Sequence, residues 1–221
     1  MTGAIPTGQA PSTADFVRRA TTRLSFDLPT DLFADGYAVR PGDHVAEGLV
    51  AGETLTRAKA AAVLVPVVDH RSEATVLLTE RVATLRAHSG QIAFPGGRID
   101  PGDASPLAAA LREAWEEVGL VAEQVTPLGY LPPYLIGTGY LVVPTVALVR
   151  PPLRLRLNPD EVAEAFEVPL AFLMDPRNHR RQSRDFGGTL RSFIAMPYAE
   201  RNIWGATAGM LHSLHRQLYA S

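Results

Sequence analysis

Three glutamates at helical spacing are the first candidates for chemistry in this sequence. Glu116 and Glu117 follow Glu113 by three and four residues, so on an α-helix their carboxylates are neighbours. Like charges at this spacing repel by roughly a few tenths of a kcal/mol per pair on an exposed helix. One interpretation is a solvated helix face that Arg112 partly neutralises. Another is a site for a hard divalent cation such as Mg²⁺ or Mn²⁺, which clustered carboxylate oxygens suit.

A glycine pair precedes these glutamates. Phe94-Pro95-Gly96-Gly97 leads into the polar stretch 98–103 and then into the predicted helix. Two adjacent glycines let the backbone bend tightly and bring carbonyl oxygens close to the carboxylates. This context favours the cation site over the solvated face.

The loop and the helix together resemble the Nudix box of the Nudix hydrolases, from Gly97 to Leu120. In that family a loop-helix-loop holds divalent cations against a diphosphate. The resemblance implies Mg²⁺ or Mn²⁺ as cofactor, held by Glu113 and Glu117 with Glu116 close by, and the Gly97 carbonyl as a further ligand. The Arg-Glu-x-x-Glu-Glu-x-Gly core of the box corresponds to Arg112, Glu113, Glu116, Glu117 and Gly119.

Two departures from the general box resemble the coenzyme A diphosphatase branch of the family. The acidic position between the glycine loop and the helix is Asp103 instead of glutamate, and the gap from Asp103 to Arg112 is one residue longer. The upstream segments LLTER at 77–81 and LRAHSGQ at 85–91 resemble a second sequence pattern of that branch.

The upstream pattern supplies the expected substrate-binding side chains Arg81, Arg86 and His88. Arginine offers a planar fork of donors that suits phosphate oxygens, and coenzyme A carries a 3′-phosphate besides its diphosphate. A strand that leaves the core through a polar loop would explain the same residues. Gly96 and Gly97 complete the expected substrate-binding residues in this region.

Two later segments are expected at the site from the same resemblance. Tyr140 follows a proline- and glycine-containing stretch that resembles the branch's loop before its next core strand, although turns would explain that stretch equally well. The segment NPDEV at 158–162 resembles the one that brings a further acidic side chain to the site, with Glu161 the candidate and Glu164 the alternative. The start of a surface helix would also explain these two glutamates.

The function implied by the resemblance is metal-dependent hydrolysis of coenzyme A or acyl-coenzyme A to 3′,5′-ADP and 4′-phosphopantetheine or its acyl form. The metal would polarise the diphosphate and activate a water for attack at phosphorus. The general base stays open among Glu113, Glu116 and Glu161. Two alternatives remain: a Nudix hydrolase of ADP-ribose, dinucleoside polyphosphates or oxidised nucleotides, and a Nudix domain that binds a nucleotide without hydrolysing it.

These residues need a scaffold, and the chain predicts one of α/β class. Ser105 as N-cap and Gly119 as stop predict a helix from about Pro106 to Val118, with Leu107, Leu111, Ala114 and Val118 as its apolar face. Apolar runs predict strands, and a late amphipathic stretch predicts a last helix: Ala61–Val68, Thr75–Thr79, Gly139–Val149, Leu190–Met196 and Ala206–Tyr219. The resemblance implies the Nudix α/β/α sandwich with a mixed β-sheet.

The first part of the chain lies outside the resemblance. We expect residues 1–55 to form an N-terminal extension and residues 56–221 to form the Nudix domain. Within the extension, Ser12 can cap a helix from about Ala14 to Leu24. Turn residues without a clear period predict an extended arm from Pro29 to Glu53.

Composition limits the partners of the protein. The 221 residues carry a formal net charge of −2, contain no cysteine and include no apolar run long enough for a membrane span. We therefore expect a cytoplasmic protein with a small-molecule substrate, and neither nucleic acid nor a membrane as partner. A homodimer stays open. A cluster of basic residues at 177–184 is expected to be a surface loop.

Overall fold

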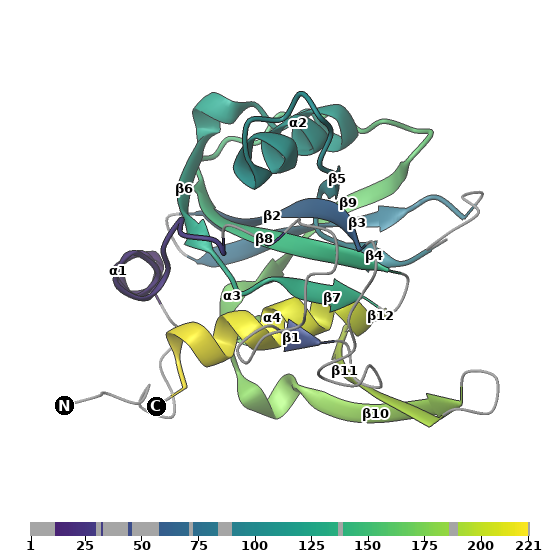
Figure 1. Cartoon of the computed structure of the whole chain (residues 1–221). Helices are drawn as coiled ribbons and strands as arrows, with labels where there is room; N and C mark the ends of the chain where they lie inside the picture. The colour runs from purple at the N-terminus through teal and green to yellow at the C-terminus, as the bar shows by residue number, and fades with distance from the viewer. Residues whose placement is uncertain are drawn as a thin grey trace.

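The computed structural model describes residues 12–29, 32, 44–45, 58–70, 73–83, 90–136, 139–185 and 190–220. A β-sheet forms the middle layer, with helix α2 on one face and helix α4 on the other (Figure 1). Figure 1 thus confirms the expected α/β/α sandwich.

The central sheet contains parallel and antiparallel strand pairs. β2 pairs in parallel with β8, whereas β3 runs antiparallel to both β2 and β9. The expected mixed sheet is therefore confirmed. Its described strands are β1 (His44–Val45), β2 (Lys59–Asp69), β3 (Ala74–Arg81), β4 (Ile92–Ala93), β5 (Gly96–Arg98), β6 (Val125–Tyr130), β7 (Tyr134–Ile136), β8 (Tyr140–Val149) and β9 (Val162–Pro169).

Strand β2 is apolar on both faces because helices cover the sheet from both sides. Val65 and Val67 belong to the core on the α4 side, and Leu64 and Val68 to the core on the α2 side. The uninterrupted apolar run in the sequence has this origin, since neither face of the strand meets solvent.

Helix α2 (Pro106–Val118) begins and ends where the sequence predicts. The Ser105 hydroxyl oxygen accepts a hydrogen bond from the Ala108 N–H at 3.1 Å, and Gly119 adopts a left-handed conformation with φ 70°. The buried face differs from the predicted one, because Leu107 and Leu111 are only half-buried. The fully buried apolar positions of the helix are Ala109, Ala110, Ala114 and Val118.

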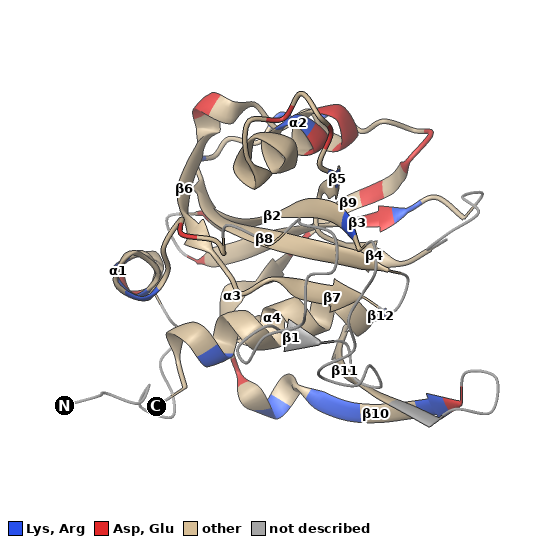
Figure 2. Ribbon diagram, in the orientation of Figure 1, with Lys and Arg blue, Asp and Glu red and all other residues tan. Residues whose placement is uncertain are grey.

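The chain after β9 builds a second, three-stranded antiparallel sheet. Between β9 and this sheet the chain forms α3 (Leu170–Leu173) and η2 (Pro176–Asn178), and after the sheet it forms α4 (Gly205–Leu218). The prediction of a basic surface loop is wrong, because most of the segment is strand β10. The residues of this strand are exposed, and blue arginine segments lie on both sides of its polar middle (Figure 2). The strands of this sheet are β10 (Arg180–Asp185), β11 (Leu190–Tyr198) and β12 (Arg201–Trp204).

Helix α1 (Thr13–Arg23) packs into the core of the sandwich. Ser12 caps it as predicted, and Phe16 and Ala20 are fully buried in the same cluster as residues of α4. Arg19 donates through Nη1 to the Leu218 carbonyl at 3.1 Å. The described part of the proposed extension is thus docked on the rest of the protein. Residues 1–11 and most of the predicted arm lie outside the described residues.

Two further features concern the whole described chain. A short 3₁₀ helix, η1 (Ala122–Gln124), connects the end of α2 to β6. None of the helices in the described ranges is long and apolar enough to cross a membrane.

Candidate active site

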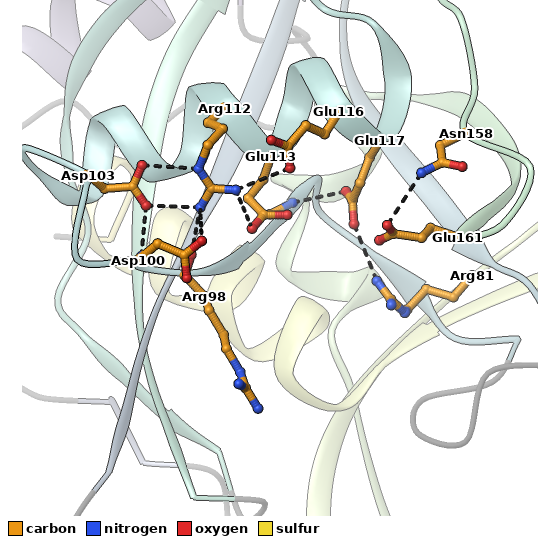
Figure 3. A network of polar contacts seen from close by, with 11 residues as sticks. Arg81, Arg98, Asp100, Asp103, Arg112, Glu113, Glu116, Glu117, Asn158 and Glu161 are labelled. Carbon is orange, nitrogen blue, oxygen red and sulfur yellow. Dashed lines mark hydrogen bonds and ion pairs between the residues drawn. The ribbon is translucent and has the colours of Figure 1, made fainter.

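The three glutamates of α2, which Figure 3 draws as sticks, differ sharply in exposure. The Glu116 side chain is 46% exposed, that of Glu113 16% and that of Glu117 only 3%. Glu117 accepts hydrogen bonds from the Gly96 N–H at 3.1 Å and from Arg81 Nη1 at 3.3 Å. The cluster therefore extends from the helix surface into the gap between α2, β3 and β5.

Arg112 ties the other two glutamates to the loop before the helix. Its Nη1 donates to Glu113 at 2.9 Å and to Glu116 at 3.1 Å, and its Nη2 donates to the Arg98 carbonyl at 3.0 Å. Nε and Nη2 form a bidentate pair with Asp103 at 3.1 and 2.9 Å. These contacts fix the position of the loop relative to the helix.

Asp103 anchors the loop through this pair and through a hydrogen bond from the Asp100 N–H at 2.8 Å. The hydrogen bonds from Arg112 hold the pKa of Asp103 below its usual range. Hydrogen bonds to Asp103 and then to Glu113 raise the pKa of Arg112 above its ordinary value, against the effect of burial. An aspartate one residue further from Arg112 thus still reaches the guanidinium.

The glycine pair is required by close approaches on both sides. β5 pairs with β2, and a Cβ on Gly96, which has φ 155°, would lie 2.4 Å from the Ala62 carbonyl oxygen. A Cβ on Gly97 would lie 2.5 Å from the carboxylate carbon of Glu113. Any larger residue at Gly97 would push the Glu113 side chain away from the backbone. The position of this carboxylate therefore depends on the glycine.

Burial makes the ionised form of these carboxylates costly. It raises the pKa of Glu117 to about 7, although the Gly96 N–H and Arg81 act in the opposite direction. Burial also raises the pKa of Glu113. A bound cation would favour the ionised forms, because an opposite charge nearby lowers the pKa of a carboxyl group.

The donor types at this site fit a hard divalent cation. They are carboxylate oxygens and backbone carbonyls, which Mg²⁺ and Mn²⁺ prefer. Within the described ranges, however, no three acidic, histidine or cysteine side chains are arranged to hold a metal ion. The hydrogen bonds account for this arrangement, since Glu113 and Glu116 are turned toward Arg112 and Glu117 faces Arg81. A cation would have to compete with these two guanidinium groups for the same oxygens.

Glu161 lies beside the cluster and Glu164 does not. Besides burial, the charge of Glu161 raises the pKa of both Glu113 and Glu117. Both carboxylate oxygens of Glu164 instead accept from Arg201 Nη2 at 2.9 Å. The alternative prediction of a surface helix start is wrong, because Glu161 lies in a turn and Glu164 in strand β9.

Asn158 positions this turn and was not singled out from the sequence. Its N–H donates to the Glu117 carbonyl at 2.9 Å, and its side-chain amide donates to Glu161 at 3.4 Å (Figure 3). A second contact fixes the turn from within, since the Asp160 N–H donates to the Asn158 side chain at 3.1 Å. Asparagine before proline is a common turn signal, and this was the one local hint.

The remaining predicted substrate residues fall into two groups. Arg81 reaches the cluster, whereas Arg86 and His88 lie outside the described residues. The Tyr140 hydroxyl accepts from Arg98 Nε at 3.2 Å and Nη2 at 3.1 Å, and the Arg98 side chain points away from the glutamates (Figure 3). The structure thus brings Arg81 and the glycine pair to the glutamates but leaves Tyr140 apart from them.

The chain is similar to known proteins in sequence and in fold. The NUDIX domain model matches residues 58–186. A Citrobacter koseri protein described as uncharacterized Nudix hydrolase NudL is 45% identical over 170 residues, which cover 76% of this chain and 87% of that protein. The Escherichia coli K12 protein of the same description is 43% identical over 167 residues, covering 75% and 85%.

Similar solved structures include a Nudix hydrolase, RenU, from M. smegmatis. It is 30% identical with a TM-score of 0.42, and the match covers 51% of this chain and 71% of that one. A C. elegans Ap4A hydrolase binary complex is 25% identical with a TM-score of 0.42, covering 50% and 80%. Because the domain model matches more than half of the chain, and relatives more than 40% identical match three quarters of it, the chain belongs to the Nudix hydrolase family.

Proposed function

We propose that this Nudix hydrolase is a divalent-metal-dependent diphosphatase that cleaves coenzyme A or acyl-coenzyme A to 3′,5′-ADP and 4′-phosphopantetheine or its acyl form. The observation that carries the proposal is the position of Arg81, whose guanidinium lies 3.3 Å from the buried Glu117 carboxylate. A cationic fork at this point is suited to the oxygens of a diphosphate. The choice of coenzyme A as substrate is supported by the sequence patterns at 77–91 and around Asp103, which resemble the coenzyme A diphosphatase branch.

Mg²⁺ or Mn²⁺ is the proposed cofactor, with Glu113, Glu116, Glu117 and the Gly97 carbonyl as its ligands. When bound, such an ion polarises a phosphoryl oxygen and lowers the pKa of a coordinated water. The chain contributes the geometry: Arg112 fixes Glu113 and Glu116 against the loop, and the absence of a side chain at Gly97 lets the backbone reach Glu113.

Arg81 would change partner during binding. In the structure its guanidinium offsets part of the buried negative charge of Glu117. If a bound cation offset this charge instead, the guanidinium donors of Arg81 would be available to phosphate oxygens. We therefore assign Arg81 to diphosphate binding, with Arg86 and His88 assigned from the sequence to the 3′-phosphate.

Among the three candidate bases we favour Glu161. Glu113 and Glu116 both accept hydrogen bonds from Arg112 and are assigned above as metal ligands, so their oxygens are already engaged. Glu161 is oriented by the neutral amide of Asn158. It would take the proton of the attacking water while the bond between phosphorus and the bridging oxygen breaks.

One experiment separates this proposal from its rivals. Turnover is measured on coenzyme A, ADP-ribose and a dinucleoside polyphosphate side by side, with and without Mg²⁺. We expect metal-dependent turnover that is fastest on coenzyme A. Faster turnover of ADP-ribose or of the dinucleoside polyphosphate would show that coenzyme A is not the preferred substrate. Binding without turnover of any of the three would identify a non-catalytic domain. The cytoplasmic location, a homodimer and the division at residue 55 stay predictions.

A further inference from the structure

A cavity of about 670 Å³ opens between the β11–β12 hairpin and the end of strands β3 and β4. The hairpin packs against β4, and the Thr207 hydroxyl donates to the Ile92 carbonyl at 2.9 Å, which fixes the start of α4 to the same strand. The volume is in the range of small-molecule sites. The lining residues used below are Glu80, Ile92, Glu200, Arg201, Asn202 and Trp204.

The cavity and the glutamate cluster lie on opposite sides of one strand end. Glu80 and Arg81 are adjacent at the end of β3, where the pairing with β9 shifts register. Arg81 points to Glu117, whereas Glu80 pairs with Arg201 at 3.3 Å on the cavity side. The Arg81 backbone also pairs with the residues just before β4, since its N–H donates to Gln91 and its carbonyl accepts from Gly90. A substrate that places its diphosphate at Arg81 is therefore bound next to Glu80, a residue that lines the cavity.

The acidic side chains around the cavity make it unfavourable for a phosphate. Glu80 and Glu200 line it, and Glu164 stands behind Arg201. Arg201 is the cation that faces these carboxylates in the lining; it pairs with Glu80 and Glu164 and lies 4.0 Å from the centroid of the Phe166 ring. Acidic residues accordingly gather at the ends of β3 and β9 (Figure 2). Such a lining repels anions and accepts hydrogen bonds from neutral N–H and O–H groups.

The aromatic wall of the cavity is held rigidly. Trp204 is half-buried, with the Phe193 ring at 5.3 Å and the Arg184 guanidinium at 5.8 Å from its centroid. Asn202 presents an exposed amide two residues before it. Both belong to β12, so the strand offers an apolar surface and a polar group to the same ligand.

The turn that carries part of this lining is strained. Ala199, between β11 and β12, has φ 49°, a left-handed conformation that a non-glycine residue rarely adopts. Strain of this kind persists only where the surrounding structure maintains it, and it concentrates at functional sites. The neighbouring residue Glu200 is thereby held at the cavity rim.

We propose that this cavity is the subsite for the uncharged pantetheine arm of the substrate, an inference that rests on the proposed function for the identity of the arm. The two amides and the hydroxyl of the arm hydrogen-bond to Asn202 and the carboxylates of Glu80 and Glu200. Its methyl and methylene groups pack on Trp204 and Ile92. The nucleotide end, with its 3′-phosphate, stays outside because the same carboxylates repel it.

Binding is tested by calorimetry on the full chain with Mg²⁺, using 4′-phosphopantetheine and 3′,5′-ADP as separate ligands. Trp204→Ala and Asn202→Ala are compared with Gln182→Ala, which changes an exposed residue of β10 outside the cavity. We expect Trp204→Ala to weaken 4′-phosphopantetheine binding about tenfold or more, and Asn202→Ala several-fold. Binding of 3′,5′-ADP should stay within twofold in both variants, and Gln182→Ala should change neither.

Equal affinities for 4′-phosphopantetheine in the parent and both cavity variants would overturn the subsite. A selective loss of 3′,5′-ADP binding would overturn it in favour of a nucleotide site. Trp204→Phe retains an aromatic wall and should retain most of the affinity. If Trp204→Ala lowers the Tm of the protein, Asn202→Ala replaces it as the test of the cavity. Coenzyme A turnover by the parent is a separate readout: its absence would refute the proposed function, while Trp204-dependent binding would still support the subsite.

Discussion

Arg81 and Glu117 face one another across the junction of β3 and α2, with Nη1 3.3 Å from Oε1. The carboxylate is almost completely buried, and the arginine side chain is 25% exposed. The pair keeps a buried acidic group partly compensated in the absence of a cation. In the proposed mechanism, a cation bound at the glutamates would therefore take over the charge compensation that the Arg81 guanidinium provides in the structure.

Replacement of Glu117 by glutamine should remove a metal ligand and leave the fold intact. We expect turnover to fall by at least about two to three orders of magnitude, the scale on which loss of one transition-state charge stabiliser acts. Steady-state kinetics at saturating Mg²⁺ measure the effect, with Glu123→Gln on the exposed turn η1 as the matched control. Turnover within a few-fold of the parent would remove Glu117 from the site.

The same variant should be more stable than the parent in the absence of metal at alkaline pH. The folded-state pKa of Glu117, about 7, lies above its usual 4.5, so protonation stabilises the fold. That contribution is complete below pH 4.5 and is lost as the pH rises through 7. The difference in pKa corresponds to roughly 3 kcal/mol, so we expect an advantage of that order for glutamine at pH 8.

Urea unfolding of both proteins in chelator, at pH 8 and at pH 4.5, measures this difference in the free energy of unfolding. The advantage of the variant should shrink toward zero at the lower pH. A constant difference between the two pH values would mean that the buried carboxylate is not the cause.

Arg112→Lys should uncouple the loop from the helix. Lysine cannot form the bidentate pair with Asp103 while also reaching Glu113 and Glu116. We expect turnover to fall at least about tenfold and the free energy of unfolding to fall by about 1–3 kcal/mol. Arg150→Lys, at an exposed position, is the control, and parent-like kinetics in Arg112→Lys would contradict the positioning role.

Activity should depend on a hard divalent cation. A chelator should abolish turnover, and Mg²⁺ or Mn²⁺ should restore it, whereas zinc should restore little because the donors are all oxygen. Turnover that continues in excess chelator would refute the metal-dependent mechanism and leave the fold assignment untouched.

Coenzyme A should be preferred over dephospho-coenzyme A, which lacks only the 3′-phosphate. A charge-assisted arginine contact is worth about 1.5–3 kcal/mol, or about ten- to a hundred-fold in kcat/KM. Arg86→Ala should bring the ratio of the two kcat/KM values close to one, and Arg154→Ala, at an exposed position, should not. Equal rates on both substrates in the parent would remove the role assigned to Arg86.

Local signals in the sequence were sufficient for the elements that carry the site. The caps of α2 at Ser105 and Gly119 and the apolar runs of β2 and β3 depend on neighbouring residues, and the structure agrees with them. The burial of Glu117 could not be predicted, because a helical period places it among exposed acids. The Gly96 N–H that donates to the buried carboxylate comes from β5 and is 21 residues away.

Strand β10 is an element that its own sequence does not predict. Its sequence, RRQSRD, contains no apolar residue and no alternation, so it resembles a loop. It is a strand because its backbone pairs along its whole length with β11, from Arg180 opposite Ala195 to Asp185 opposite Leu190. Pairing of this kind has no signal in the strand's own side chains.

The docking of α1 on α4 has a consequence for the order in which the protein can be completed during translation. Arg19 and its partner carbonyl on Leu218 are 199 residues apart, and the buried face of α1 at Phe16 and Ala20 meets the same late helix. At about 5–20 residues per second, a ribosome needs roughly 10 to 40 s to make that interval. During this time the apolar face of the nascent helix has no α4 to cover it.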